Sequence, residues 1–252
     1  MTKSRRNVVI TGASRGLGAS FARMFASSGD RVALLARSND ATTGLADEIG
    51  RCGGEAATFL CDVTDCRSVE GAMRAVGDAF GSVDILINNA GMVDPIARIA
   101  DIQPADWARH IQTNLIGAFN VLHFGLPLLG SGSVVVNVSS GASTLPVVGR
   151  SAYCAGKAGL NMLGRVLGLE EAEQGIRVIN FTPGPTDTEM HIKIRAAPIN
   201  QGHSFKPQIL ASADDPARFL LWLCSTDAAD VSGDFVSARD PALRRRAGMD
   251  SQ

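Results

Sequence analysis

The chain has 252 residues, of which 45% are hydrophobic and 19% are charged, and its formal net charge is −1. This length suits one large domain with a substantial core, and the near-neutral charge argues against a nucleic-acid or anionic-lipid partner. Its five cysteines lack metal-type spacing, and no uncharged apolar run approaches the ~20 residues that span a bilayer. We therefore expect a cytoplasmic protein with reduced thiols, no signal peptide, no metal site and no membrane segment.

Short apolar runs alternate along the chain with segments in which apolar residues recur at helical spacing. Buried strands separated by helices are typical of a parallel sheet covered on both faces. The pattern predicts one α/β domain over residues 1–252, a Rossmann-type doubly wound parallel sheet of about seven strands. The first six strands are expected at 7–11, 31–36, 56–61, 83–87, 133–140 and 177–181, and helices at 17–26, 41–50, 69–80, 105–129, about 150–173 and 215–224.

The turn between the first strand and the first helix reads TGASRGLG over residues 11–18. Glycines here let the backbone turn tightly and approach a pyrophosphate at the helix N-terminus. The spacing is GxxxGxG rather than the general GxGxxG. Its place directly after a strand and before an amphipathic helix predicts a nucleotide site formed by Gly12, Ser14, Arg15, Gly16, Leu17 and Gly18.

The second predicted strand ends at Ala36-Arg37 without the carboxylate that NAD-binding proteins usually place near the adenosine ribose. Arg37 and Arg15 are instead suited to clamp a 2′-phosphate, which predicts NADP(H) as the cofactor. The alternative is a pair of solvated surface arginines. Further along the cofactor, we expect contacts from Asp62, Val63, Asn89, Ala90 and Gly91, with Asp62 accepting from the adenine amine.

A second group of candidate residues lies near the middle of the chain. Tyr153 and Lys157 are four residues apart, so a helix places both side chains on one face. An ammonium beside a phenol favours the phenolate and lowers the pKa of the phenol, as general acid–base catalysis requires. The strand before them ends in hydroxyls at Ser139 and Ser140. The alternative is an ordinary pair on a surface helix.

These motifs, together with NNAG at 88–91 and Pro183-Gly184, resemble the short-chain dehydrogenase/reductase family over residues 6–190. The resemblance implies that Tyr153 donates the proton, that Ser140 orients the carbonyl and that Lys157 lowers the tyrosine pKa and holds the nicotinamide ribose. It also implies that Asn114 holds a water relay. Further cofactor contacts are implied for Pro183, Gly184, Thr186 and Thr188. It also implies a small carbonyl substrate and a homodimer or homotetramer formed through residues 105–129 and 150–174.

Several segments are similar to sepiapterin reductases and their bacterial diketone-reducing relatives, among them YCAGKA at 153–158 and PGPTDTEM at 183–190. In that branch a carboxylate near the C-terminus holds the pterin ring, and the corresponding residue here is Asp240. Arg239 departs from the pattern because an aromatic residue is usual there. The alternative is that Asp240 begins a disordered tail at 241–252, with solvated arginines at 244–246.

Residues 184–214 carry little periodicity, which predicts a substrate loop. His191 and His203 either touch the substrate there or are solvated, whereas His110 and His123 on the long helix are expected to be structural. The leading hypothesis is an NADPH-dependent reductase of a ketone or dicarbonyl. The alternatives are a reductase of a 3-oxoacyl thioester, a sugar or a steroid-type alcohol, and a non-catalytic NADP-sensing regulator.

Overall fold

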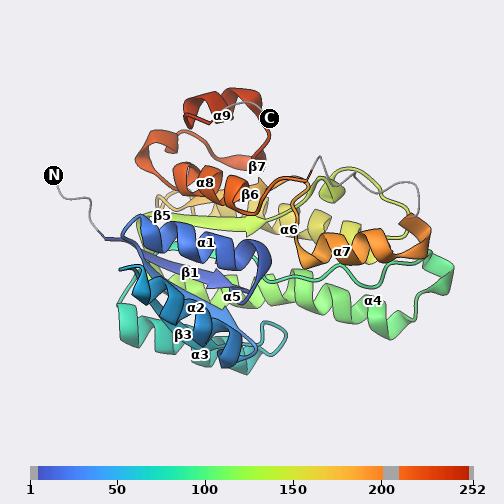
Figure 1. The fold of residues 1–252 in the computed structure, drawn as a ribbon, viewed down its shortest axis with the longest axis horizontal. Coiled ribbons are helices and arrows are strands. Elements are labelled where there is room, and N and C mark those ends of the chain that lie inside the picture. Colours follow the sequence, from blue (N-terminus) through green and yellow to red (C-terminus); the bar gives the residue numbers. More distant parts are fainter. Residues whose placement is uncertain (1–4, 201–209, 250–252) are drawn as a thin grey trace.

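The computed structural model describes residues 5–200 and 210–249, which form one α/β domain around a seven-stranded parallel sheet (Figure 1). The strand order is β3-β2-β1-β4-β5-β6-β7. The order reverses between β1 and β4, and in open α/β sheets this switch point opens a crevice at the carboxyl ends of the strands. The strands are β1 (Asn7–Thr11), β2 (Arg31–Ala36), β3 (Glu55–Leu60), β4 (Val83–Asn88), β5 (Leu129–Val138), β6 (Arg177–Thr182) and β7 (Gly233–Ser237).

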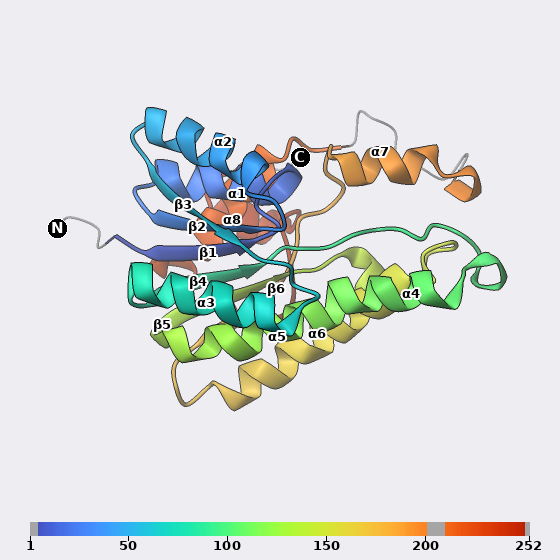
Figure 2. The ribbon, with the colours of Figure 1, turned by 90° about the horizontal axis from the view of Figure 1, so that it is seen from below.

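Helices cover both faces of the sheet (Figure 2). Val8 and Ile10 of β1 pack into one apolar layer and Val9 into the other, which confirms that the apolar runs are strands buried on both sides. None of the described helices is long and apolar enough to cross a membrane. One layer holds α1 (Gly16–Ser27), α2 (Asn39–Arg51) and α8 (Asp214–Leu223), and the other holds α3 (Cys66–Phe80), α4 (Pro104–Ile111), α5 (Gly117–Gly125) and α6 (Ser151–Glu170).

The predicted single helix over 105–129 was wrong, because it is interrupted. Residues Gln112–Ile116 form a π-helical turn between α4 and α5, and a 3₁₀ turn at Leu126–Leu128 precedes β5. The extra residue of a π turn is often found at functional sites. The π turn contains Asn114, whose side-chain amide forms two hydrogen bonds of 2.8 Å with the backbone of Met92, after β4.

The C-terminal third is more ordered than its composition predicted. The expected substrate loop contains helix α7 (Glu189–Ala196) and a 3₁₀ turn at Pro198–Asn200; His203 lies outside the described residues. The expected tail forms helix α9 (Pro241–Arg246). Arg244 is buried and donates to both carboxylate oxygens of Asp215 at 2.9 and 3.0 Å, so its assignment to a solvated tail was wrong.

Three buried asparagines join neighbouring strands beneath the site. Asn88, Asn137 and Asn180 lie in register on β4, β5 and β6, and their amides are linked at 3.2 and 3.1 Å. The last amide continues to the carbonyl of Asn161 on α6 at 2.9 Å. A buried polar network whose members are all paired specifies one arrangement of its elements. This network fixes α6 against the ends of β5 and β6.

Candidate active site

The glycine-rich turn after β1 packs directly against the end of β4. Gly12 has φ +64°, and a Cβ there would lie 2.8 Å from Ala90 Cα. A Cβ on Gly18 would lie 2.3 Å from the carbonyl oxygen of Gly12. The amide of Asn89 donates to the carbonyls of Thr11 and Gly12 at 2.9 and 3.1 Å, so this side chain holds the turn in place.

The start of α1 is suited to a phosphate group. Its N-cap, Arg15, forms no side-chain capping bond, and its first turn has no acidic residue. The first backbone N–H groups of the helix therefore remain available to an anion, which the helix dipole also favours. A Cβ on Gly16 would meet Thr188 Cγ2 at 3.7 Å. The residues at 183–188 thus border the same turn, and the arrangement fits the diphosphate of a dinucleotide.

Residues predicted for the adenosine end follow three adjacent strands. Arg15 comes after β1, Arg37 after β2 and Asp62 after β3. Arg37 is exposed, and Arg15, which is 66% exposed, forms a 2.7 Å ion pair with Glu189 on α7. Asp62 Oδ1 accepts hydrogen bonds from the amide and hydroxyl of Thr64 at 3.0 and 2.8 Å, which orients the carboxylate.

The structure brings the four predicted catalytic residues together beyond the end of β5. Ser140 follows β5 and its hydroxyl is hydrogen-bonded with Tyr153 near the start of α6. One turn later, Lys157 Nζ lies 5.9 Å from the Tyr153 ring centroid and donates to the Val138 carbonyl at 2.7 Å. Asn114 lies against the same helix, because a Cβ on Gly156 would be 3.4 Å from Asn114 Cβ.

Burial dominates the electrostatics of this group. It raises the pKa of Tyr153 above its ordinary value, while the Ser140 hydrogen bond and the positive charge of Arg150 oppose that rise. It also lowers the pKa of the Lys157 ammonium to about 8. For the protein alone the pKa of Tyr153 is therefore raised rather than lowered as expected, and a lowering by Lys157 stays a prediction. Burial affects the pKa of Tyr153 more than any nearby charge does, and the cation that lowers this pKa is Arg150.

His110 was expected to be only structural, yet it contacts two of the four residues. It is completely buried, its ring meets the Tyr153 ring edge-on at 5.9 Å, and its Nε2 lies 2.8 Å from Asn114 Nδ2. Its Nδ1 lies 2.7 Å from the carbonyl of Asp94, which only accepts, so we assign the proton to Nδ1. Burial lowers its pKa and favours this neutral form. In the sequence, the four-residue spacing of His110 and Asn114 on one predicted helix was the signal that could have indicated their contact.

Asp240, the predicted substrate anchor, is the N-cap of α9. Its Oδ1 accepts from the backbone N–H groups of Ala242 and Leu243 at 2.8 and 3.0 Å. The idea that it merely begins a disordered tail was wrong, because the helix follows directly. Substrate binding by this carboxylate stays a prediction.

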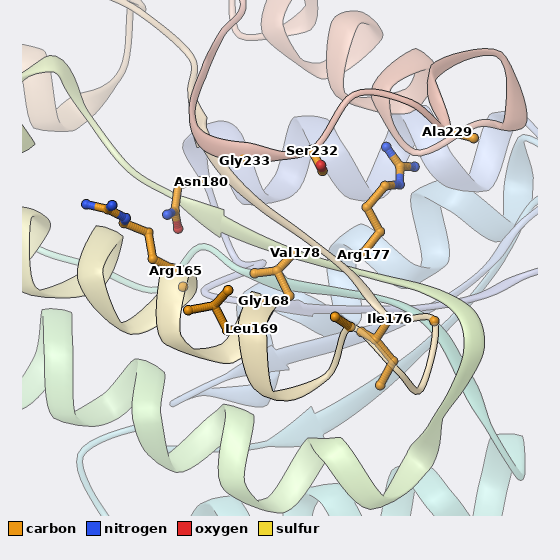
Figure 3. A pocket seen from close by; sticks show the side chains of 13 residues that line it. Arg165, Gly168, Leu169, Ile176, Arg177, Val178, Asn180, Ala229, Ser232 and Gly233 are labelled. Atoms are coloured by element: carbon orange, nitrogen blue, oxygen red, sulfur yellow. The ribbon is translucent and has the colours of Figure 1, made fainter.

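A pocket of about 440 Å³ lies elsewhere, between the C-terminal half of α6 and the strands β6 and β7 (Figure 3). Leu169, Arg177 and Gly233 are among the residues that line it, and none of the four catalytic candidates does. No group of three or more His, Cys, Asp or Glu side chains suited to a metal ion occurs among the described residues.

Comparison with known proteins agrees with this geometry. The short chain dehydrogenase family profile matches residues 6–198. D-threitol dehydrogenase of Mycolicibacterium smegmatis is 33% identical over 89% of this chain and 88% of its own length, and serine 3-dehydrogenase of Agrobacterium fabrum is 32% identical over 86% and 87%. A crystal structure of actinorhodin polyketide ketoreductase with NADPH aligns with a TM-score of 0.85 at 27% identity, over 94% of this chain and 96% of that one.

A profile match over most of the chain and relatives above 30% identity along nearly the whole length show the family. The chain belongs to the short-chain dehydrogenases, oxidoreductases that use a nicotinamide cofactor and act on CH–OH or C=O groups.

Proposed function

We propose that this protein is an NADPH-dependent carbonyl reductase that converts a ketone or dicarbonyl to the corresponding alcohol. The observation that carries the proposal is the group formed by the half-buried Ser140 and the buried Tyr153 and Lys157, which lies beyond the end of β5. A regulator that only senses the nucleotide would have no physical need for all three side chains and Asn114.

The chain's own groups supply the proton and the orientation. The bound cofactor supplies the hydride to the carbonyl carbon. Tyr153 then gives its phenolic proton to the carbonyl oxygen as negative charge develops there, and its raised pKa keeps that proton in place beforehand. The Ser140 hydroxyl donates a hydrogen bond to the same oxygen. In this proposal Lys157 holds the nicotinamide ribose, and Asn114 holds the water relay that returns a proton toward Tyr153.

The preference for NADPH rests on the arginines at the adenosine end. Arg15 and Arg37 follow neighbouring strands, and the end of β2 lacks the carboxylate that would favour NADH. Arg15 is mostly exposed, so it can leave Glu189 for a phosphate. The neighbouring ketoreductase structure contains NADPH, which supports the same choice.

The substrate class is supported only in broad terms. The relatives are named for threitol, serine and a dichlorocyclohexadiene diol, which share hydroxyl groups. A pterin side chain or a vicinal diketone remains within the proposal, but the pterin choice depends on Asp240, which already caps α9.

We propose that the protein forms a homodimer or homotetramer through the outer faces of α5 and α6. Such faces bury apolar side chains against a second copy. The exposed apolar side chains are Ile116 just before α5, Phe119 on α5, and Met162, Val166 and Leu169 on α6.

The direct test is NADPH oxidation against sepiapterin, benzil, acetoacetyl thioesters and simple aldehydes, with NADH run in parallel and with blanks that lack either protein or carbonyl compound. We expect turnover of at least one ketone or dicarbonyl, and faster turnover with NADPH than with NADH. NADPH binding without turnover of any carbonyl compound would contradict the proposal and favour a nucleotide sensor.

A further inference from the structure

A cationic side chain that has no role in the proposed chemistry lies beside the proton donor. Arg150 is the N-cap of α6, three residues before Tyr153, and its carbonyl accepts the Cys154 N–H at 2.8 Å. Side chains three apart at a helix are near neighbours, with Cβ atoms about 5–6 Å apart. Its positive charge lowers the pKa of both Tyr153 and His191 of α7, so the guanidinium is close enough to act on both side chains.

The guanidinium of Arg150 is only partly satisfied. Its Nε is buried and has no hydrogen-bond partner among the described residues, and no described carboxylate forms an ion pair with it. Buried donors are normally paired, and one left unpaired is costly unless a ligand completes it. Burial also lowers the pKa of this guanidinium.

Three carboxylates on or next to α7 already have cationic partners. Asp94 pairs with Lys193 at 2.7 Å, and Glu189 pairs with Arg15 at 2.7 Å. Asp187 lies 3.9 Å from Arg195. Apolar side chains also pack around Tyr153, including Val93, Ala142, Val147, Met190 and Ile194. Arg150 is therefore a cation near an apolar wall, and no carboxylate of the described residues neutralises it.

We propose that Arg150 binds a carboxylate of the substrate, which makes the substrate a short 2- or 3-oxo acid or the corresponding hydroxy acid. The planar guanidinium matches a carboxylate with two parallel hydrogen bonds. Because Arg150 lies only three residues before Tyr153, the substrate should be short, with at most one carbon between the carboxylate and the reacting carbonyl. This inference rests on the proposed reductase function and specifies its substrate class.

The test compares 3-oxobutanoate with 3-oxobutanamide, which have the same skeleton and differ in charge. The purified full chain is assayed with NADPH, as the unmodified protein and as Arg150→Met, Arg150→Lys and Arg195→Met. Arg195 lies on α7 and, like Arg150, its charge acts on His191, but it has Asp187 as a partner, so it controls for a general loss of positive charge. NADPH affinity and melting temperature are measured for every variant.

We expect the unmodified protein to prefer the acid, and Arg150→Met to lower kcat/KM for the acid by about 10- to 100-fold, as expected for one charge-assisted contact. The amide should change by less than about threefold. Arg150→Lys should recover part of the preference, and Arg195→Met should keep it. Malonate should inhibit reduction of a neutral ketone by the unmodified protein and not by Arg150→Met.

Equal losses for acid and amide in Arg150→Met would overturn the inference, because Arg150 would then act through Tyr153 or the fold. Turnover of neutral ketones with no preference for the acid and no inhibition by malonate would also overturn it while leaving the proposed function intact. Failure to reduce any carbonyl compound would instead contradict the proposed function. If Arg150→Met does not fold, Arg150→Lys and the malonate assay of the unmodified protein decide.

Discussion

The ammonium of Lys157 is only 5% exposed, so its ionisation is coupled to folding. Burial lowers its pKa from 10.5 to about 8 in the folded chain. Between these two values the unfolded chain holds a proton that the folded chain has released, so the contribution of Lys157 to stability becomes more favourable as pH rises. Below the folded value the penalty for the buried charge is complete, at about 3 kcal/mol.

Lys157→Met removes this titration from both states. Unmodified protein and variant share every other titrating group, including the buried thiols of Cys61 and Cys224, whose pKa values burial raises to about 12. Those groups cancel in the difference between the two unfolding free energies. From about pH 7 to about pH 10, the unmodified protein should gain about 2–3 kcal/mol relative to the variant.

The assay is urea unfolding followed by circular dichroism at both pH values, with equal dependence on urea in the two proteins as the check that the same surface unfolds. A difference in free energy that stays constant between the two pH values would refute the reasoning. It would mean that the Val138 carbonyl keeps the ammonium as well solvated as water does.

Other substitutions test the nucleotide end, the buried network and the cap of α9. Arg37→Asp should reverse the preference between NADPH and NADH dissociation constants, and equal constants in the unmodified protein would contradict the 2′-phosphate assignment. Gly164→Ala should destabilise the fold by about 1–3 kcal/mol, because its Cβ would lie 2.3 Å from Asn180 Oδ1, whereas Gly168→Ala on the same helix, with Val178 at 3.7 Å, should not destabilise it. Asp240→Ala should cost about 1 kcal/mol and Asp240→Asn less, and a tenfold rise in KM for sepiapterin in Asp240→Asn would show that the carboxylate also binds substrate.

Most of the sheet and the nucleotide turn could be predicted because their signals are local. A β-branched run such as Asn7–Thr11 predicts a strand, and the glycine-rich turn after it predicts the connection to the next helix. The four-residue spacing of Tyr153 and Lys157 placed both correctly on one helix, and Ser140 followed from the end of β5.

The parts that failed depend on contacts between distant segments. The π turn at Asn114 accompanies hydrogen bonds to Met92, which no helical periodicity can indicate. Helix α9 is stabilised by Asp240 at its start and by the ion pair of Arg244 with Asp215. The pKa of Tyr153 depends on how deeply the folded chain buries it, and the sequence contains no measure of that burial.

The same limit explains why Arg150 and His110 were missed as neighbours of the site. Arg150 stands just before a helix, where an arginine is usually solvated. His110 lies on α4, and only the packing of α4 against α6 brings it to Tyr153.

The central claim is that Tyr153 is the proton donor, and Tyr153→Phe tests it most directly. Tyr153 is the only tyrosine in the chain, so no other phenol can replace it. With the best carbonyl substrate, the variant should bind NADPH as tightly as the unmodified protein while its kcat falls by about 10²–10⁴. Near-normal turnover by a folded, NADPH-binding Tyr153→Phe protein would show that the proton comes from another group and would contradict the account.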